Sequence, residues 1–358
     1  MQAEYLNALL ADSKTGCPNI LSAFRLAVEN RNAIEKALSD SFAQWVSLDT
    51  SLVVYGSLAR NEFTRHSDVD WTYLVDGQAN SDHLSIANDI KDTLKAAGFK
   101  GPSQQGAFGA MVFSHSLIHQ IGGEDDTNRN MTQRVLLLLE SVAIGGKAQE
   151  AYERVLKGII NRYLEEDSSL LTHDGRRYKV PRFLLNDLAR FWRTMAVDFA
   201  SKQRVRMGKG WGLRNLKLRM SRKLLFASGL LACFGCHLDL KPTSDDPRKH
   251  DELRAYLVEY LRNQFRMSPL ELLAYSIQQY DVPREVGVTL FEAYDRFLCV
   301  LNDADKRKHL EELRAEESSS DEAFQQVREM SRDFQMSLDS IFFKNELIGP
   351  LTRRYGVF

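Results

Sequence analysis

A short apolar run that stops at a glycine-serine pair, followed by two closely spaced aspartates, is the most constraining feature of this sequence. Leu52 to Tyr55 favour an extended strand, and Gly56-Ser57 ends it. A second extended segment opens with Asp68-Val69-Asp70 and stops after Val75. Because side chains alternate between the two faces of a strand, Asp68 and Asp70 are expected on one face, with Val69 buried behind them.

These residue types point to phosphate and metal chemistry. A strand that ends in Gly-Ser where a helix begins presents backbone N–H groups and a hydroxyl to a phosphate, and Gly56 allows close approach. Two carboxylates held a few ångströms apart repel each other unless a cation lies between them, and oxygen ligands of this kind select Mg²⁺ or Mn²⁺. We therefore expect a metal-held triphosphate beside Gly56-Ser57. The alternative is a glycine turn with two surface aspartates.

The segment resembles the minimal nucleotidyltransferase superfamily, which includes DNA polymerase β, the CCA-adding enzymes and bacterial protein-adenylylating enzymes. The family signature is an apolar strand, Gly-Ser or Gly-Gly, a short spacer and Asp-x-Asp on the next strand. Here these are Gly56-Ser57 and Asp68-x-Asp70. The resemblance implies that Gly56 and Ser57 hold the β- and γ-phosphates, and that Asp68 and Asp70 bind the catalytic metals. It covers about residues 45–145.

The third carboxylate of the family's two-metal members has no obvious counterpart. The third expected strand lies within residues 107–121, which contain no acid. Either the loop around Glu124 to Asp126 folds back and Asp126 completes the metal site, or the site works with two carboxylates. A further interpretation is that Asp126 and Thr127 initiate the next helix.

A basic cluster lies in the second half of the chain. The whole chain has 47 Lys and Arg against 48 Asp and Glu, yet residues 201–223 contain no acid. On a regular helix Arg214, Lys217 and Ser221 share a face, which predicts a cationic surface for a triphosphate or a nucleic-acid backbone; an ordinary solvated face is the alternative. The family resemblance implies that Lys217 and Ser221 contact the triphosphate. The nine cations are Lys202, Arg204, Arg206, Lys209, Arg214, Lys217, Arg219, Arg222 and Lys223.

The expected fold class is α+β, with a small mixed-sheet nucleotidyltransferase palm followed by a mainly α-helical domain. We expect helices that pack on the palm at 1–45, the palm at 46–145 and the helical domain at 146–358. The expected helices include one over 133–142 and one over 213–234. There is no long apolar stretch, no secretory signal and no more than four cysteines, so we expect a cytoplasmic protein that does not enter a membrane.

The expected activity is template-independent transfer of a nucleoside monophosphate, or its deoxy counterpart, from an ATP- or dATP-like triphosphate to a hydroxyl. The acceptor is either a growing single-stranded oligonucleotide or a protein side chain, which would be AMPylated. Residues 187–193 and 211–222 show a weaker resemblance to bacterial phage-defence enzymes of the Hailong type, which implies antiviral defence and a partner effector protein. The rival hypothesis is a catalytically poor, nucleotide-binding regulatory protein, because the third acid is missing.

Overall fold

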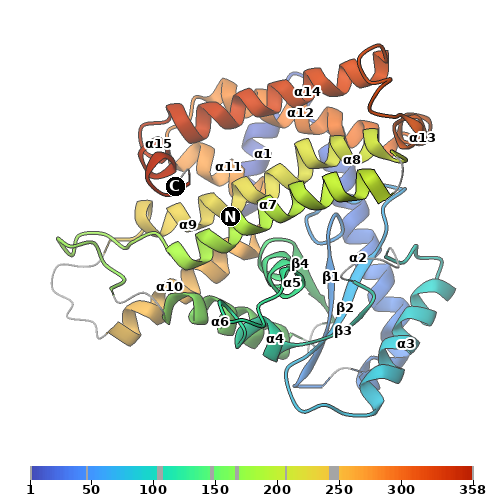
Figure 1. The fold of residues 1–358 in the computed structure, drawn as a ribbon, viewed down its shortest axis with the longest axis vertical. Helices are drawn as coiled ribbons and strands as arrows, with labels where there is room; N and C mark the ends of the chain where they lie inside the picture. Colours follow the sequence, from blue (N-terminus) through green and yellow to red (C-terminus); the bar gives the residue numbers. More distant parts are fainter. Residues whose placement is uncertain are drawn as a thin grey trace. The chain divides into compact units, whose positions relative to one another are not determined.

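The computed structural model describes residues 2–45, 47–102, 108–145, 149–165, 169–205, 208–241 and 250–356 (Figure 1). The chain divides into two compact units. The sheet unit comprises residues 24–176 and 242–268, and the helical unit comprises residues 1–23, 177–241 and 269–358. The domain borders expected at residues 45 and 145 stay a prediction.

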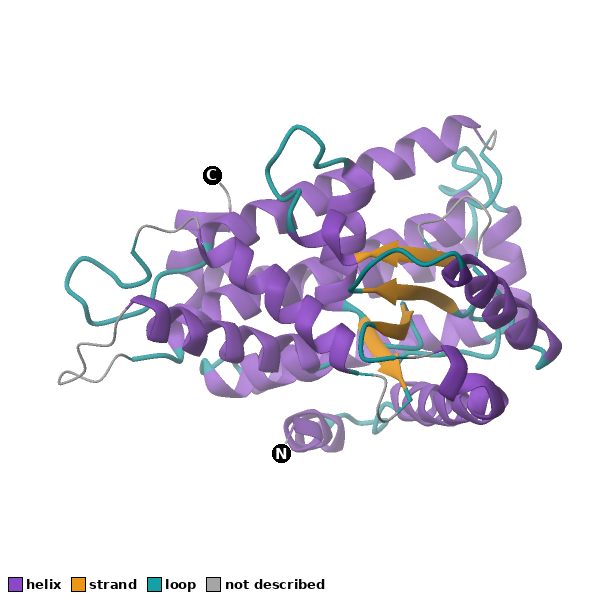
Figure 2. Cartoon of the chain, turned by 90° about the horizontal axis from the view of Figure 1, so that it is seen from below, coloured by secondary structure: helices purple, strands orange, loops and turns teal. Residues whose placement is uncertain are grey.

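A four-stranded mixed sheet organises the sheet unit (Figure 2). The strand order is β3-β2-β1-β4, with β1 antiparallel to both of its neighbours and β3 parallel to β2. The expected α+β class, with a small mixed sheet followed by a mainly helical region, is confirmed. The strands are β1 (Thr50–Tyr55), β2 (Asp70–Val75), β3 (Ala110–Phe113) and β4 (Ser141–Ile144).

One face of the sheet carries the apolar core of this unit. Leu52, Trp71 and Tyr73 are each 1 % exposed and pack with apolar residues of α2 (Pro18–Trp45) and α3 (Asp82–Ala96). These side chains come from alternate strand positions, as a sheet covered by helices requires. The opposite face meets α6, since Ser51 Oγ accepts a hydrogen bond from the Tyr152 backbone N–H at 3.2 Å. The remaining helices of the sheet unit are α4 (Ser114–Ile118), α5 (Asn128–Leu139), α6 (Glu150–Glu165) and α10 (His250–Arg266).

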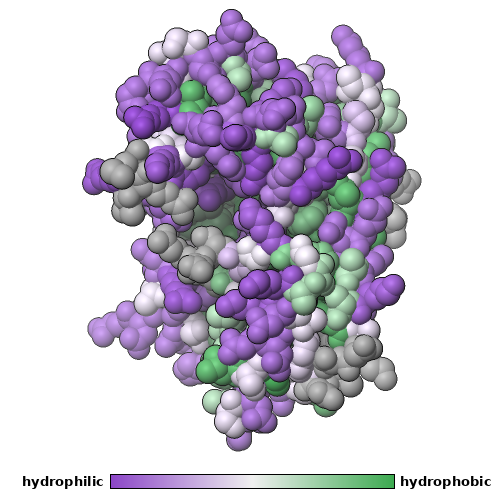
Figure 3. Space-filling model, turned by 90° about the vertical axis from the view of Figure 1, so that its right-hand side faces the viewer, coloured by the Kyte–Doolittle hydropathy of each residue, from purple (hydrophilic) through white to green (hydrophobic). Residues whose placement is uncertain are grey.

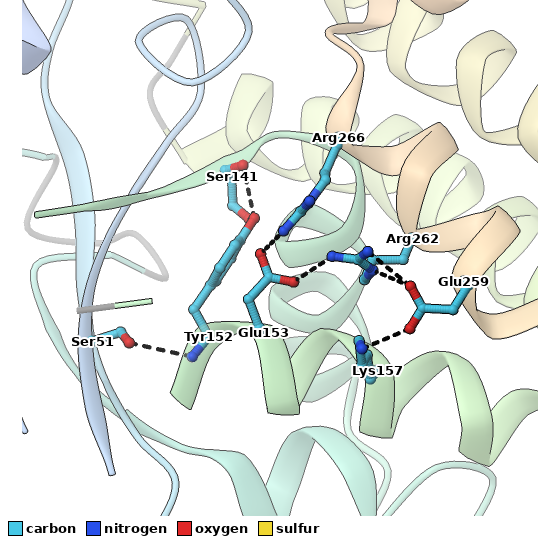
Figure 4. A network of polar contacts seen from close by, with 8 residues as sticks. All are labelled: Ser51, Ser141, Tyr152, Glu153, Lys157, Glu259, Arg262 and Arg266. Carbon is cyan, nitrogen blue, oxygen red and sulfur yellow. Dashed lines mark hydrogen bonds and ion pairs between the residues drawn. The ribbon is translucent and has the colours of Figure 1, made fainter. Parts of the chain in front are cut away.

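Ion pairs join α6 to α10, which is distant in sequence (Figure 4). Glu153 on α6 accepts hydrogen bonds from Arg262, at 3.1 Å, and from Arg266. On the neighbouring turn, Glu259 binds Arg262 at 2.8 Å and Lys157 at 2.6 Å. Each carboxylate therefore bridges two cations.

The helical unit is built around α9, whose apolar sequence is buried on nearly every side. No described helix is both long and apolar enough to cross a membrane. Polar side chains cover most of the face drawn in Figure 3, with smaller apolar areas between them. The elements are α1 (Gln2–Asp12), α7 (Arg182–Val205), α8 (Trp211–Lys217), η1 (Leu218–Arg222), α9 (Lys223–Leu238), α11 (Pro269–Gln279), α12 (Arg284–Asn302), α13 (Ala304–Glu312), α14 (Glu322–Asp339), η2 (Ser340–Lys344), α15 (Ile348–Leu351) and η3 (Thr352–Gly356).

Two helices expected from the sequence differ in the structure. The helix expected over 133–142 ends at Leu139, because Glu140 leaves the helical region at φ −148° and the chain continues as β4 beside β1. The helix expected over 213–234 is interrupted by the π-helical turn η1. A leucine-rich run does not reveal by periodicity where a helix gives way to a buried strand.

We predict that Glu153→Gln lowers the free energy of unfolding by about 1 kcal/mol, because it removes the charge that two arginines of α10 share. Urea denaturation measures this, with Glu35→Gln on the exposed surface of α2 as the matched control. The difference should shrink at 1 M NaCl, since salt screens half-exposed ion pairs (~3 Å Debye length). Equal stability of the two variants at low salt would contradict this role.

Candidate active site

The Gly56-Ser57 segment is a tight turn that leaves the end of β1. Gly56 has φ +68°, in the left-handed region that glycine enters at little cost. Gly56 O accepts from the Arg60 N–H at 3.0 Å, and Ser57 O accepts from the Glu62 N–H at 2.8 Å. The chain forms successive turns here rather than the expected helix start, so the backbone of the segment is fixed by its own hydrogen bonds.

Asp70 faces this turn directly. It is the first residue of β2 and pairs with Tyr55, the last residue of β1. A Cβ placed on Gly56 would lie 3.1 Å from the Asp70 Oδ2 atom. The absence of a side chain at Gly56 therefore leaves room for the Asp70 carboxylate beside the turn.

Asp68 lies just before β2, two residues from Asp70. Val69 between them is 1 % exposed in the apolar core, and its N–H donates to Lys100 O at 2.7 Å. The Asp68 Oδ1 atom is shielded from solvent and receives no hydrogen bond of good geometry from a described residue. The Lys100 Nζ atom lies 2.6 Å from it, on a side chain that is 66 % exposed.

These two carboxylates fit a hard divalent cation. Mg²⁺ is usually held in proteins by one or two carboxylates, with phosphate and water oxygens as its other ligands. A shielded Asp68 oxygen, balanced by an exposed lysine, is a donor of the right kind. Within the part of the chain that the structure describes, no three His, Cys, Asp or Glu side chains gather as a metal site. The donor set therefore fits a two-carboxylate site that a phosphate would complete.

Asp126, the expected third ligand, is held elsewhere. Its two oxygens accept from Arg134 at 3.2 and 3.0 Å, and the Arg134 side chain is fully buried. Asp126 precedes α5, whose 12 residues span about 18 Å before Ser141 pairs with Tyr55. Asp126 therefore lies about one length of α5 away from the Tyr55 end of β1. This position differs from the one expected for a third metal ligand. Thr127 caps α5, with Oγ1 accepting from Asn130 N at 3.1 Å.

A buried charge cluster beside the turn was missed by sequence reasoning. Arg60 forms an ion pair with Glu62 at 2.9 Å and another with Glu140, and the three side chains are 10 %, 1 % and 7 % exposed. Glu140 lies between α5 and β4, so the cluster ties the Gly56-Ser57 turn to the neighbouring strand. Burial, opposed by the hydrogen bond between Tyr55 and Thr72, raises the pKa of the adjacent Tyr55 far above its usual value. No local pattern links Arg60 to Glu140, 80 residues away.

The expected triphosphate contacts of the basic cluster lie in the helical unit. Lys217 is the last residue of α8, and Ser221 lies in η1 with its hydroxyl donating to Lys217 O at 3.3 Å. Arg214 turns its guanidinium to the backbone oxygens of Lys209 and Gly210, at 2.8 and 3.1 Å. The π turn also changes the register that a regular helix would give. Arg206 lies outside the described residues.

Comparison with known proteins gives one family. Residues 33–99 match the model of the nucleotidyltransferase domain. The matched segment contains Gly56, Ser57, Asp68 and Asp70, and it supports the minimal nucleotidyltransferase superfamily and nucleotidyl transfer in general. Neither the curated proteins nor the solved structures gave a match.

We predict that Gly56→Ala weakens binding of Mg²⁺ and a nucleoside triphosphate, because the new methyl group would lie 3.1 Å from Asp70 Oδ2 and shift that carboxylate slightly. Gly98→Ala is the matched control: Gly98 also has positive φ, +86°, but its Cβ would meet nothing within 4 Å. Both variants should lose about 1 to 2 kcal/mol of stability from backbone strain. Titration calorimetry should detect weaker nucleotide binding by Gly56→Ala than by Gly98→Ala, and equal binding by both variants would contradict the assignment.

We predict that Arg60→Leu lowers the free energy of unfolding by about 3 to 5 kcal/mol, because Glu62 and Glu140 would lose their shared cation in a buried setting. Arg25, exposed on α2, provides the control, since Arg25→Leu should change stability by about 0.5 kcal/mol or less. Chemical denaturation distinguishes the two. Similar unfolding curves would mean that the cluster does not anchor the turn.

Proposed function

We propose that this chain is a metal-dependent, template-independent nucleotidyltransferase that transfers a nucleoside monophosphate from a triphosphate to a hydroxyl and releases pyrophosphate. The observation that carries this proposal is the position of the Asp70 carboxylate beside the turn, where a side chain at Gly56 would come within 3.1 Å of Asp70 Oδ2. Such an arrangement allows a phosphate to lie against the turn while its metal is held by the adjacent acids. The family match over residues 33–99 supports the same chemistry.

Each residue of the site has a proposed role. Asp68 and Asp70 would hold Mg²⁺ or Mn²⁺, which when bound supplies charge compensation for the triphosphate and for the pyrophosphate that leaves. The Ser57 hydroxyl and the N–H groups of the turn would orient the β- and γ-phosphates. Lys217 and Ser221 are proposed as further triphosphate contacts from the helical unit. Most of the rate enhancement in such a site comes from positioning and electrostatics.

We do not include Asp126 among the proposed metal ligands, because both of its oxygens are bound to Arg134. The proposed site works with two carboxylates. Asp68 is already balanced by the exposed charge of Lys100, so a divalent cation would replace a solvent-exposed partner rather than a buried one.

The acceptor and the biological setting are also proposals. We favour an ATP- or dATP-like donor and a growing single-stranded oligonucleotide as acceptor, with AMPylation of a protein as the alternative. Action in antiviral defence and with a partner effector protein follows from the weaker sequence resemblance, and action in the cytoplasm is proposed from the low cysteine content. A second candidate function, a catalytically poor nucleotide-binding regulator, is favoured by the buried ion pair that occupies Asp126.

We predict that Asp68→Asn and Asp70→Asn each lower nucleotidyl transfer at least 100-fold, because the amide is a far weaker metal ligand than the carboxylate. The purified chain is incubated with Mg²⁺ and each labelled ribo- or deoxynucleoside triphosphate, and pyrophosphate and labelled products are measured. Asp89→Asn, on the exposed side of α3, should retain full activity.

The location of the label identifies the acceptor. Labelled oligomers would support oligonucleotide synthesis, and label on the polypeptide would support protein modification. If no nucleotide is turned over, and Asp68→Asn binds nucleotide as well as the parent does, the chain is a nucleotide-binding regulator instead of an enzyme.

A further inference from the structure

Two helical segments of the helical unit run side by side in the same direction. Trp211, at the start of α8, contacts the ring of Phe324 near the start of α14, with ring centroids 5.0 Å apart. Further along, Lys223 at the start of α9 donates a hydrogen bond to Gln335 of α14. Between these two contacts, Arg219 of η1 and Arg328 of α14 lie on the sides of the two segments that face each other, and η1 packs against α14.

Arg219, Lys223 and Arg328, the three cations on these facing sides, each contact neutral side chains. The Arg219 Nε donates to the Asn215 side-chain oxygen at 2.7 Å, and Lys223 donates to Gln335. Arg328 lies over the Phe324 ring, 5.5 Å from its centroid, with a long contact of 3.5 Å to Ser318 Oγ. A neutral acceptor orients a cation without cancelling its charge, so these contacts leave the positive charge available.

The three cations are close enough to repel one another. Burial lowers the pKa of Lys223, the Arg219 charge lowers it further, and Asp339 opposes the shift. Burial also lowers the pKa of Arg219, with an added contribution from Arg328. Three cations and one carboxylate thus share a partly desolvated area. An anion bound among them would relieve the repulsion.

Two aromatic rings extend this surface. Phe226 lies three residues after Lys223 on α9, and it stacks on Trp192 of α7 with centroids 5.6 Å apart and an interplanar angle of 16°. Both side chains are half-buried, so part of each ring stays accessible. Cations followed by accessible rings are the combination by which proteins bind single strands: the charges follow the phosphates and the rings stack with bases.

We propose that Arg219, Lys223 and Arg328 bind the phosphodiester backbone of a single-stranded oligonucleotide, with the Trp192-Phe226 pair as a stacking surface for a base. This inference rests on the proposed function to the extent that the oligonucleotide is its acceptor or product. The residues involved differ from the Gly56-Ser57 turn, the two aspartates, Lys217 and Ser221, so the two proposals can be tested separately.

The test measures binding of a fluorescently labelled 12-nucleotide single strand by anisotropy, without nucleotide or Mg²⁺, over a range of salt concentrations. Arg219→Gln, Lys223→Gln and Arg328→Gln should each weaken binding roughly fivefold to tenfold at low salt. Each should also reduce the slope of log affinity against log salt by about 0.7, the value for one phosphate contact on a single strand. Trp192→Ala should weaken binding with little change of slope.

Matched variants control for charge and folding. Lys14→Gln removes one charge from an exposed residue of the helical unit and should bind as the parent does. Arg219→Lys keeps the charge and should restore the salt slope. Circular dichroism and thermal unfolding confirm that each variant is folded.

The outcomes separate this inference from the proposed function. The inference is overturned if the parent does not bind the strand, if the glutamine variants bind as Lys14→Gln does, or if they raise only the KM for nucleoside triphosphate. In that last case the three cations bind the nucleoside triphosphate instead of the strand. Failure of the proposed function would appear differently, as an absence of pyrophosphate release by the parent, whether or not the strand binds.

Discussion

The antiparallel pairing of β1 with β2 is the constraint on which the candidate site depends. It places Tyr55 opposite Asp70, so the chain leaving β1 passes the carboxylate at Gly56, where no side chain intervenes. A shift of this pairing by one residue would turn Asp70 into the apolar core and Val69 out of it. Because Trp71 and Tyr73 are buried on the core face, that shift is costly, and the packing of the sheet therefore fixes the geometry of the site.

Buried arginines decide which acids remain available for a metal. Near one end of α5, Arg134 donates hydrogen bonds to both oxygens of Asp126. Near the other end, Arg60 forms ion pairs with Glu62 and Glu140. Separating a carboxylate from a buried guanidinium partner is costly, whereas the ion-pair partner of Asp68 among the described residues is an exposed lysine. The exposed partner of Asp68, together with the position of Asp70 beside Gly56, suits these two acids to a metal-held phosphate.

Local patterns were sufficient for part of this structure. The apolar run before Gly56, the alternation through Val75 and the helical periodicity of the second half predicted β1, β2 and most helices, and they brought Gly56 close to Asp70. The features that local patterns did not predict depend on residues that are distant in the sequence. β4 forms because β1 offers a free edge, Arg60 meets Glu140 across 80 residues, and Arg328 joins Arg219 from another helix. The pairing of Asp126 with the buried Arg134, eight residues away, was likewise not predicted from the sequence.

The most direct test of this account is a crystal structure of the chain with Mg²⁺ and a nucleoside triphosphate analogue that cannot be cleaved between the α- and β-phosphates. The account predicts the metal bound by Asp68 and Asp70, with the terminal phosphates against the N–H groups of Gly56 and Ser57. A structure in which the carboxylates keep their protein partners and the triphosphate lies away from this turn would contradict it.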